Sequence, residues 1–267
     1  MHLAYSIAAF STMATAQIAA SLDDFMTISS FPTEHRDSAV LGSIPFKVAV
    51  ADQRASYCMY IPESAFNAVN ETDSKLSLVV NVHGTSRRAE QGAAVLAPLF
   101  PCGIIDPNDA DNYKEIFYKG IRYNQLLIGI LEEVKVRREG IIEIEKFFLM
   151  GYSGGGQFAL RFLYLRPEKL YAASIGAPGT VTSLDSTPWP RGVSNTIELF
   201  GVQVEPARIR DVRLHVVVGE LDNSVAGEGV RDVVGGQVGA ASRVETLVAL
   251  HKSWGEAGIE SKLDIVA

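Results

Sequence analysis

Short runs of β-branched and other apolar residues alternate along the chain with longer segments of helical period. The first two runs lie close together and alternate apolar with polar positions, which predicts an antiparallel hairpin. Most later runs are almost continuously apolar, as in strands buried on both faces of a parallel sheet. The pattern predicts an α/β fold, a mostly parallel eight-stranded sheet flanked by helices. Strands are expected at 46–51, 56–61, 76–82, 95–100, 146–151, 171–175, 213–218 and 262–266.

The segments between these runs predict helices at about 120–138, 155–165 and 240–257. In the last of them, Val244, Leu247, Val248 and Trp254 are expected on one apolar face that covers the sheet. The loops at 176–205 and 223–239 both follow strands. We therefore expect them above the carboxyl edge of the sheet, where ligands bind in such folds.

The 267-residue chain divides into an N-terminal extension, 1–44, and one expected domain, 45–267. Residues 1–22 carry no Asp, Glu, Lys or Arg, and the small-x-small pattern at 14–16 is compatible with a secretory signal. The segment lacks a basic start and is diluted by Ser and Thr, so a soluble extension is favoured over a signal. A stable membrane span is favoured least. The compartment stays open, with the cytoplasm slightly favoured.

Charge and cysteine content narrow the classes of function. A net charge of −7 and a pI near 5.3 argue against a nucleic-acid partner and suit an enzyme acting on neutral or small substrates. Two cysteines, Cys58 and Cys102, are too few for a disulfide scaffold, and both are expected to be buried thiols. The sequence has no H-E-x-x-H, no Cys/His cluster and no dinucleotide fingerprint. No metal and no organic cofactor are expected.

The strongest motif is Gly-Tyr-Ser-Gly-Gly at 151–155, where a buried strand runs into a helix rich in Ala, Phe and Leu. This is the context that a nucleophile elbow requires, and it makes Ser153 the candidate nucleophile. Gly151 and Gly155 are expected where strand and helix approach too closely for a Cβ. A phosphate cradle is the rival interpretation. It is disfavoured because no Lys-Ser/Thr pair follows and the spacing is not G-x-G-x-x-G.

A second motif, His83-Gly84-Thr85, ends the predicted strand 76–82. With this motif and the serine turn, the chain resembles the α/β-hydrolase family over about 45–267. The resemblance implies the α/β-hydrolase fold and an oxyanion hole formed by the backbone N–H groups of Thr85 and Gly154. It also implies that His83 shapes the loop and is not the catalytic base. A hydrogen-bonded histidine at a strand end is an equally structural alternative.

The third motif is Gly-Glu-Leu-Asp at 219–222, at the end of a β-branched strand. By the resemblance, Asp222 would orient the imidazole of a catalytic triad, in the order Ser, Asp, His. The alternative is a loop aspartate that bonds its own turn. Glu220 is a weaker substitute. His215, in the middle of the strand, is expected to be a packed residue.

The triad histidine is missing from its expected place. Only His251 follows Asp222, and it falls within the predicted helix, about 16 Å from the helix start at about 1.5 Å per residue. It is therefore a poor candidate for the base. In the family this histidine follows the last strand, which places it beyond Ala267. We interpret the chain as truncated before its catalytic histidine, with a natural pseudoenzyme as the alternative.

Within the family, the chain is most similar to esterases and polyhydroxyalkanoate depolymerases, because Gln157-Phe158-Ala159 follows the elbow and Pro167-Glu168 the helix. The implied activity is hydrolysis of small-molecule or polymeric carboxylic esters through an acyl-enzyme on Ser153. A serine peptidase or amidase and a non-catalytic binding protein stay open as alternatives. Trp189 is expected either as an aromatic wall of the substrate pocket or as simple loop packing. The segment 106–113 is expected either to contact substrate or, as the favoured interpretation, to be a solvated acidic turn.

Overall fold

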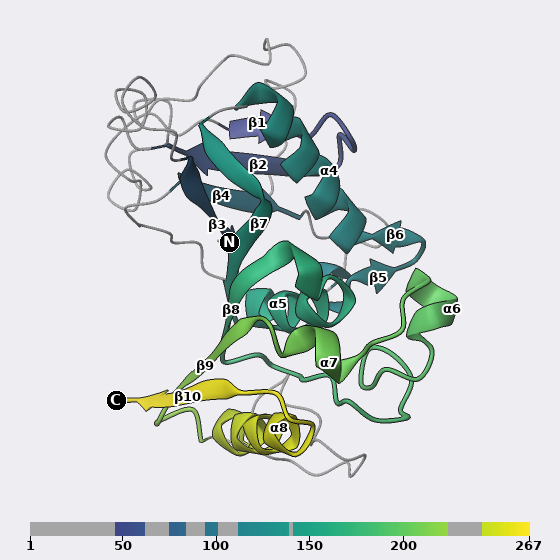
Figure 1. Cartoon of the computed structure of the whole chain (residues 1–267), viewed down its shortest axis with the longest axis vertical. Helices are drawn as coiled ribbons and strands as arrows, with labels where there is room; N and C mark the ends of the chain where they lie inside the picture. Colours follow the sequence, from purple (N-terminus) through teal and green to yellow (C-terminus); the bar gives the residue numbers. More distant parts are fainter. Residues whose placement is uncertain (1–45, 62–74, 84–93, 101–111, 139–140, 224–241) are drawn as a thin grey trace, which may run out of the picture.

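The computed structural model describes residues 46–61, 75–83, 94–100, 112–138, 141–223 and 242–267. These residues form an eight-stranded sheet of order β1-β2-β4-β3-β7-β8-β9-β10 (Figure 1). The strands from β4 to β10 in this order are parallel, whereas β2 is antiparallel to both β1 and β4. The strands are β1 (Phe46–Val48), β2 (Ser56–Tyr60), β3 (Leu76–Val82), β4 (Ala94–Leu99), β7 (Ile142–Tyr152), β8 (Leu170–Gly176), β9 (Arg213–Gly219) and β10 (Ser261–Val266).

The mostly parallel sheet and the initial hairpin that the apolar pattern predicts are confirmed. A two-stranded sheet formed by β5 (Phe117–Tyr118) and β6 (Ile121–Arg122) has no counterpart in the prediction, because each strand is only two residues long. The remaining elements are η2 (Asn112–Glu115), α4 (Tyr123–Arg137), α5 (Gly154–Leu165), η3 (Pro167–Lys169), α6 (Thr196–Phe200), α7 (Pro206–Ile209) and α8 (Arg243–Glu256).

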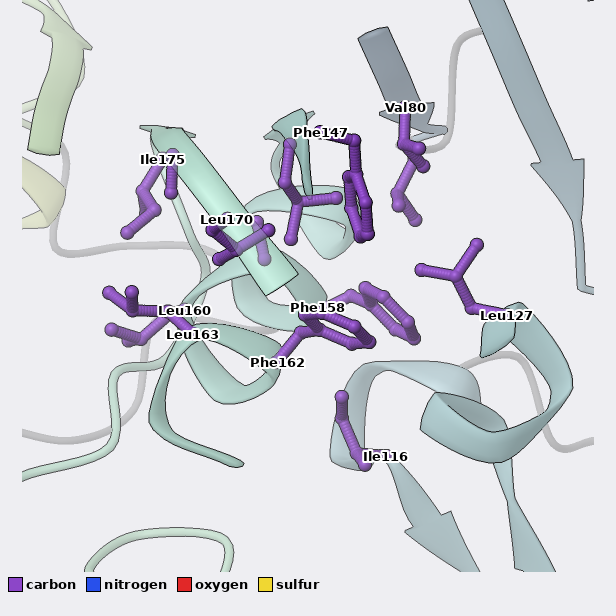
Figure 2. Close-up of a cluster of buried hydrophobic side chains, with 14 of the residues drawn as sticks. Val80, Ile116, Leu127, Phe147, Phe158, Leu160, Phe162, Leu163, Leu170 and Ile175 are labelled. Atoms are coloured by element: carbon purple, nitrogen blue, oxygen red, sulfur yellow. The ribbon is translucent and has the colours of Figure 1, made fainter. Parts of the chain in front are cut away.

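Helix α5 lies at the centre of the core, and every residue in it except Gln157 is buried. Phe158 stacks on Phe100 with ring centroids 5.2 Å apart, and Phe162 packs against Phe147 of β7. Figure 2 shows this cluster between the sheet, α5 and Leu127 of α4. Burial of this apolar surface holds the start of α5 against the ends of β7 and β8.

Helix α8 packs beside β9 and β10 and begins at a capping box, in which Ser242 and Glu245 satisfy each other's backbone N–H groups. Leu247, Leu250 and Trp254 are buried, and Trp254 Nε1 donates to Tyr164 Oη of α5 at 2.8 Å. Burial raises the pKa of Tyr164, so this phenol stays neutral. The prediction for Val248 is wrong. Its side chain is 44% exposed, because the buried stripe follows positions 247, 250 and 254.

The opposite face of β8, β9 and β10 is more open than the apolar pattern predicts. In β9 the buried residues alternate with half-buried ones, and no residue of β10 is fully buried. The expectation that these strands are buried on both faces is therefore wrong for this part of the sheet. In the described part of the chain, no helix combines the length and apolar character that a membrane span needs.

Candidate active site

Ser153 occupies the sharp turn between β7 and α5. Its backbone has φ 55° and ψ −115°, a conformation that residues other than glycine rarely adopt. Two backbone hydrogen bonds hold the turn: Ser153 N donates to Gly176 O at 2.8 Å, and Gln157 N donates to Ser153 O at 3.1 Å. The strained turn thus places Ser153 at the carboxyl edge of the sheet and at the N-terminus of α5.

Three glycines make this turn sterically possible. A Cβ on Gly151 would lie 2.2 Å from Gly155 O, and one on Gly155 would lie 2.0 Å from Val82 O. A Cβ on Gly156 would lie 2.5 Å from Gly176 O. These distances are far shorter than any van der Waals contact, so α5 packs against β3, β7 and β8 at a separation that only glycine allows.

The 3₁₀ helix η2 covers the residue after the serine. The Cβ position of Gly154 lies 2.5 Å from Lys114 Cε and 2.6 Å from Tyr113 Oη. Tyr113 Oη in turn donates to His83 O at 3.1 Å, and the two rings lie 5.0 Å apart. Tyr113 is 2% exposed, so the expected solvated turn is wrong at this residue. Thr85, the other predicted oxyanion-hole residue, lies outside the described residues.

A buried guanidinium joins η2 and the loop after β8 to α5. Arg161 is 2% exposed; its Nε donates to Thr182 Oγ1 at 3.0 Å, one Nη donates to Lys114 O at 2.5 Å and the other to Thr180 Oγ1 at 3.0 Å. Gln157 Oε1 accepts from Thr180 Oγ1 at 2.7 Å and from Arg161 at 3.2 Å. Arg161 was not among the predicted site residues, because an arginine inside an apolar helix gives no signal of its partners.

Trp189 is anchored in the same region. Its Nε1 donates to Glu115 O at 2.7 Å, and its ring packs edge-on against Phe200 at 5.0 Å. The side chain is 9% exposed. Trp189 therefore ties the loop after β8 to η2, and its contact with a substrate stays a prediction.

Asp222 lies just after β9, and its carboxylate is held by a guanidinium. One Nη of Arg243, the first residue of α8, donates to both carboxylate oxygens of Asp222, at 3.1 Å and 3.0 Å. Asp222 N also donates to Gly219 O at 3.0 Å. Arg243 was not predicted, because it lies 21 residues after Asp222 and no sequence pattern links the two residues. The charge that Asp222 faces in this structure is a guanidinium and not an imidazole.

We expect the Asp222–Arg243 pair to stabilise the fold modestly. Both side chains are about a quarter exposed, 24% and 27%, so each can still be hydrated. Asp222→Asn and Arg243→Gln, measured singly and together by urea unfolding, should show a coupling free energy of about 1 kcal/mol. Strictly additive losses would mean that the ion pair contributes nothing to stability.

Two of the described histidines, His251 and His215, hydrogen-bond residues other than Ser153. His251, in α8, shares a hydrogen bond of 2.7 Å between its Nδ1 and Oγ of Ser261, the first residue of β10. This contact lies at the amino edge of the sheet, opposite the edge that carries Ser153. His215 bonds Ser174 Oγ and Asp264 Oδ2, each at 3.1 Å, and its side chain is 38% exposed. The expectation of a packed His215 is wrong, because it lies on the open face of the sheet.

Two further expectations concern cysteines and metals. Cys58 is half-buried and makes no disulfide, so the expected full burial is wrong for this thiol. Cys102 lies outside the described residues. Among the described residues, no three His, Cys, Asp or Glu side chains are grouped closely enough to hold a metal ion.

Comparison with solved structures supplies the name of the fold. A poly(3-hydroxybutyrate) depolymerase from Bordetella parapertussis superposes with a TM-score of 0.57 at 16% identity, over 83% of this chain and 81% of that one. A poly(aspartic acid) hydrolase-1 from Sphingomonas sp. KT-1 gives 0.53 at 17% identity, over 79% and 86%. The chain has the α/β-hydrolase fold.

A ferulic acid esterase shares the α/β-hydrolase fold with this chain, with a TM-score of 0.54 at 11% identity, over 84% of this chain and 88% of that one. No protein-family model and no curated protein sequence matches the chain. At these identities the likeness establishes the α/β-hydrolase fold alone, so any activity must be argued from the residues.

Proposed function

We propose that the chain is a serine hydrolase that cleaves carboxylic esters through an acyl-enzyme on Ser153. The observation that carries the proposal is the φ of 55° at Ser153, in a turn where α5 and three strands are packed at glycine-only distances. Backbone strain of this kind persists where the surrounding structure enforces it, and it clusters at functional sites. In an α/β-hydrolase fold, a serine in this turn is the expected nucleophile.

The proposed reaction proceeds in two steps. Ser153 Oγ attacks the ester carbonyl and its proton passes to a base; the tetrahedral oxyanion accepts hydrogen bonds from the N–H groups of Gly154 and Thr85. Collapse expels the alcohol, and water then hydrolyses the acyl group from Ser153. The N-terminus of α5 supports the oxyanion, because its partial positive charge faces the developing negative charge.

The proposal assigns Asp222 to the orientation of the base. Its carboxylate pairs with Arg243 in this structure, so an imidazole would have to share or replace that contact. The same observation supports a second candidate function, a ligand-binding protein that keeps the serine turn but performs no catalysis. The substrate in the first case is an ester, small or polymeric.

The test is labelling of the folded chain by a fluorophosphonate probe, with and without millimolar imidazole in the buffer. Added imidazole can act as the base, because His215 and His251 bond Ser174, Asp264 and Ser261 and not Ser153. We expect labelling at Ser153, mapped by peptide mass spectrometry, that is faster with imidazole and absent in Ser153→Ala.

Two results would decide against the hydrolase. Labelling that persists in Ser153→Ala would assign the reactivity to another residue. A correctly folded chain that is not labelled at Ser153 under either condition would favour the binding protein. Labelling at full rate without imidazole would support the nucleophile and place its base within the chain.

A further inference from the structure

Among the described residues, the last strand of the sheet has one unpaired edge. β10 pairs with β9 from Ser261 opposite Leu214 to Val266 opposite Gly219, and no other described strand pairs with its outer side. Figure 1 shows β10 at one end of the sheet, beside α8. Ile265 and Val266 are 48% and 46% exposed. An edge of this kind is a template for pairing with another strand.

We propose that β10 pairs in antiparallel fashion with β10 of a second copy of this chain, with Leu263 at the two-fold axis. The two eight-stranded sheets would then continue into each other. The proposal concerns the sheet edge only and is independent of the reaction at Ser153.

The geometry of a two-fold axis limits the possible registers. When the two-fold axis is perpendicular to the sheet, the same face of the sheet points to the same side in both copies. Residues directly opposite in an antiparallel pair share a face, and side chains alternate along a strand. Each such register is therefore centred on a residue and not between two residues.

Charge selects one register among these. A centre at Leu263 places Lys262 opposite Asp264 of the second copy, and does so twice by symmetry. A centre at Lys262 places two lysines opposite each other, and a centre at Asp264 places two aspartates opposite each other. Like charges directly opposite are destabilising, and unlike charges are favourable. A centre at Lys262 would also leave only Ser261 to Leu263 paired, whereas the centre at Leu263 pairs Ser261 to Ile265.

The side chains of Lys262 and Asp264 are accessible for ion pairs with a second copy of the chain. Lys262 and Asp264 lie two residues apart on one face, with 72% and 35% of their side chains exposed. Within one chain, Lys262 Nζ lies 2.6 Å from Asp264 Oδ2, and His215 Nε2 lies 3.1 Å from the same oxygen. Lys262 first, and His215 with it, lower the pKa of Asp264, which keeps the carboxylate charged. Backbone hydrogen bonds supply the attraction, and the opposite charges favour this register over its neighbours.

The first experiment uses charge variants of the full chain in sedimentation equilibrium. Lys262→Asp makes the edge acidic and Asp264→Lys makes it basic, so each homodimer would place like charges opposite each other twice. We expect each variant to dissociate at least tenfold more readily than the wild type, and an equimolar mixture to recover the wild-type affinity as a heterodimer. Recovery requires both variants to be folded, so a folding defect cannot imitate it.

The second experiment tests the register by cross-linking in a Cys58→Ser, Cys102→Ser background. Opposite residues at an antiparallel pair have Cβ atoms about 4.5–5.5 Å apart, close to disulfide distance. Leu263→Cys should therefore form a disulfide-linked dimer on mild oxidation. Ile265→Cys is the matched control, because its copies would lie about 13 Å apart along the strands.

Several outcomes would overturn the proposal. A wild-type chain that stays monomeric at every concentration would exclude the dimer. It would mean that Lys262 and Asp264 prevent the edge of β10 from pairing with another strand. Cross-linking of Ile265→Cys in preference to Leu263→Cys would exclude the register. A dimer that is indifferent to both charge variants would place the interface elsewhere.

Discussion

Gly155→Ala is expected to lower the free energy of unfolding by at least about 3 kcal/mol, because the new methyl group has no room. Its Cβ would lie 2.0 Å from Val82 O and 3.0 Å from His83 O, both backbone atoms of a central strand and its end. Neither atom can move without displacing β3 or α5. The measurement is urea unfolding followed by circular dichroism.

The matched control is Gly255→Ala, a glycine-to-alanine change in α8. No atom lies within 4 Å of its Cβ position. Removing a helical glycine should raise the free energy of unfolding by about 0.5–1 kcal/mol. Equal stability of the two variants would show that α5 does not approach β3 as closely as the glycine geometry requires. In labelling, Gly155→Ala should also lose reactivity at Ser153, since the turn depends on this packing.

The sequence predicts the serine turn well, because the signal is local. A buried strand, four glycines around Ser153 and an apolar helix follow one another within about twenty residues. The initial hairpin follows from the same kind of short-range pattern. The partial exposure of one face of β9 could not be predicted from such local patterns. Val217 is apolar and His215 is aromatic, yet both are only half-buried, because the described helices do not cover this face.

The contacts among the residues around Ser153, and those around Asp222, could not be predicted from sequence patterns. The position of Asp222 after a strand follows from the sequence, but its pairing with Arg243 depends on where α8 begins in space. In the same way, Tyr113 and Lys114 reach Gly154 only because η2 folds over α5. The sequence separation of these partners is large, so no periodicity or spacing links them. The position of the turn at Ser153 is therefore predictable from the sequence, whereas the side chains that surround the turn are not.

Arg161 is the residue whose loss we expect to disturb these surroundings most. It lies within α5, yet its donors reach Lys114 O in η2 and Thr180 and Thr182 in the loop after β8. A guanidinium suits this position, because its planar fork directs several donors at once. A hydrogen bond from a charged group contributes about 1.5–3 kcal/mol, and buried acceptors left without a donor carry a penalty.

Arg161→Met keeps the length of the side chain but removes every donor, and we expect it to lower the free energy of unfolding by about 3 kcal/mol. Arg161→Lys keeps the charge but cannot donate both to η2 and to the loop after β8. It should therefore recover only part of the lost stability. The control is Arg208→Met, an exposed arginine paired with Glu168 on the surface, for which a change below about 1 kcal/mol is expected.

A local readout separates the anchoring of η2 from general loss of stability. Trp189 Nε1 donates to Glu115 O, next to the carbonyl that Arg161 holds, so loosening η2 should expose Trp189. In a Trp254→Phe background, Arg161→Met should shift the tryptophan emission of the native state to longer wavelength, whereas Arg208→Met should leave it unchanged. An unchanged spectrum with the full stability loss would mean that Arg161 supports the core of α5 without fixing η2 beside Ser153.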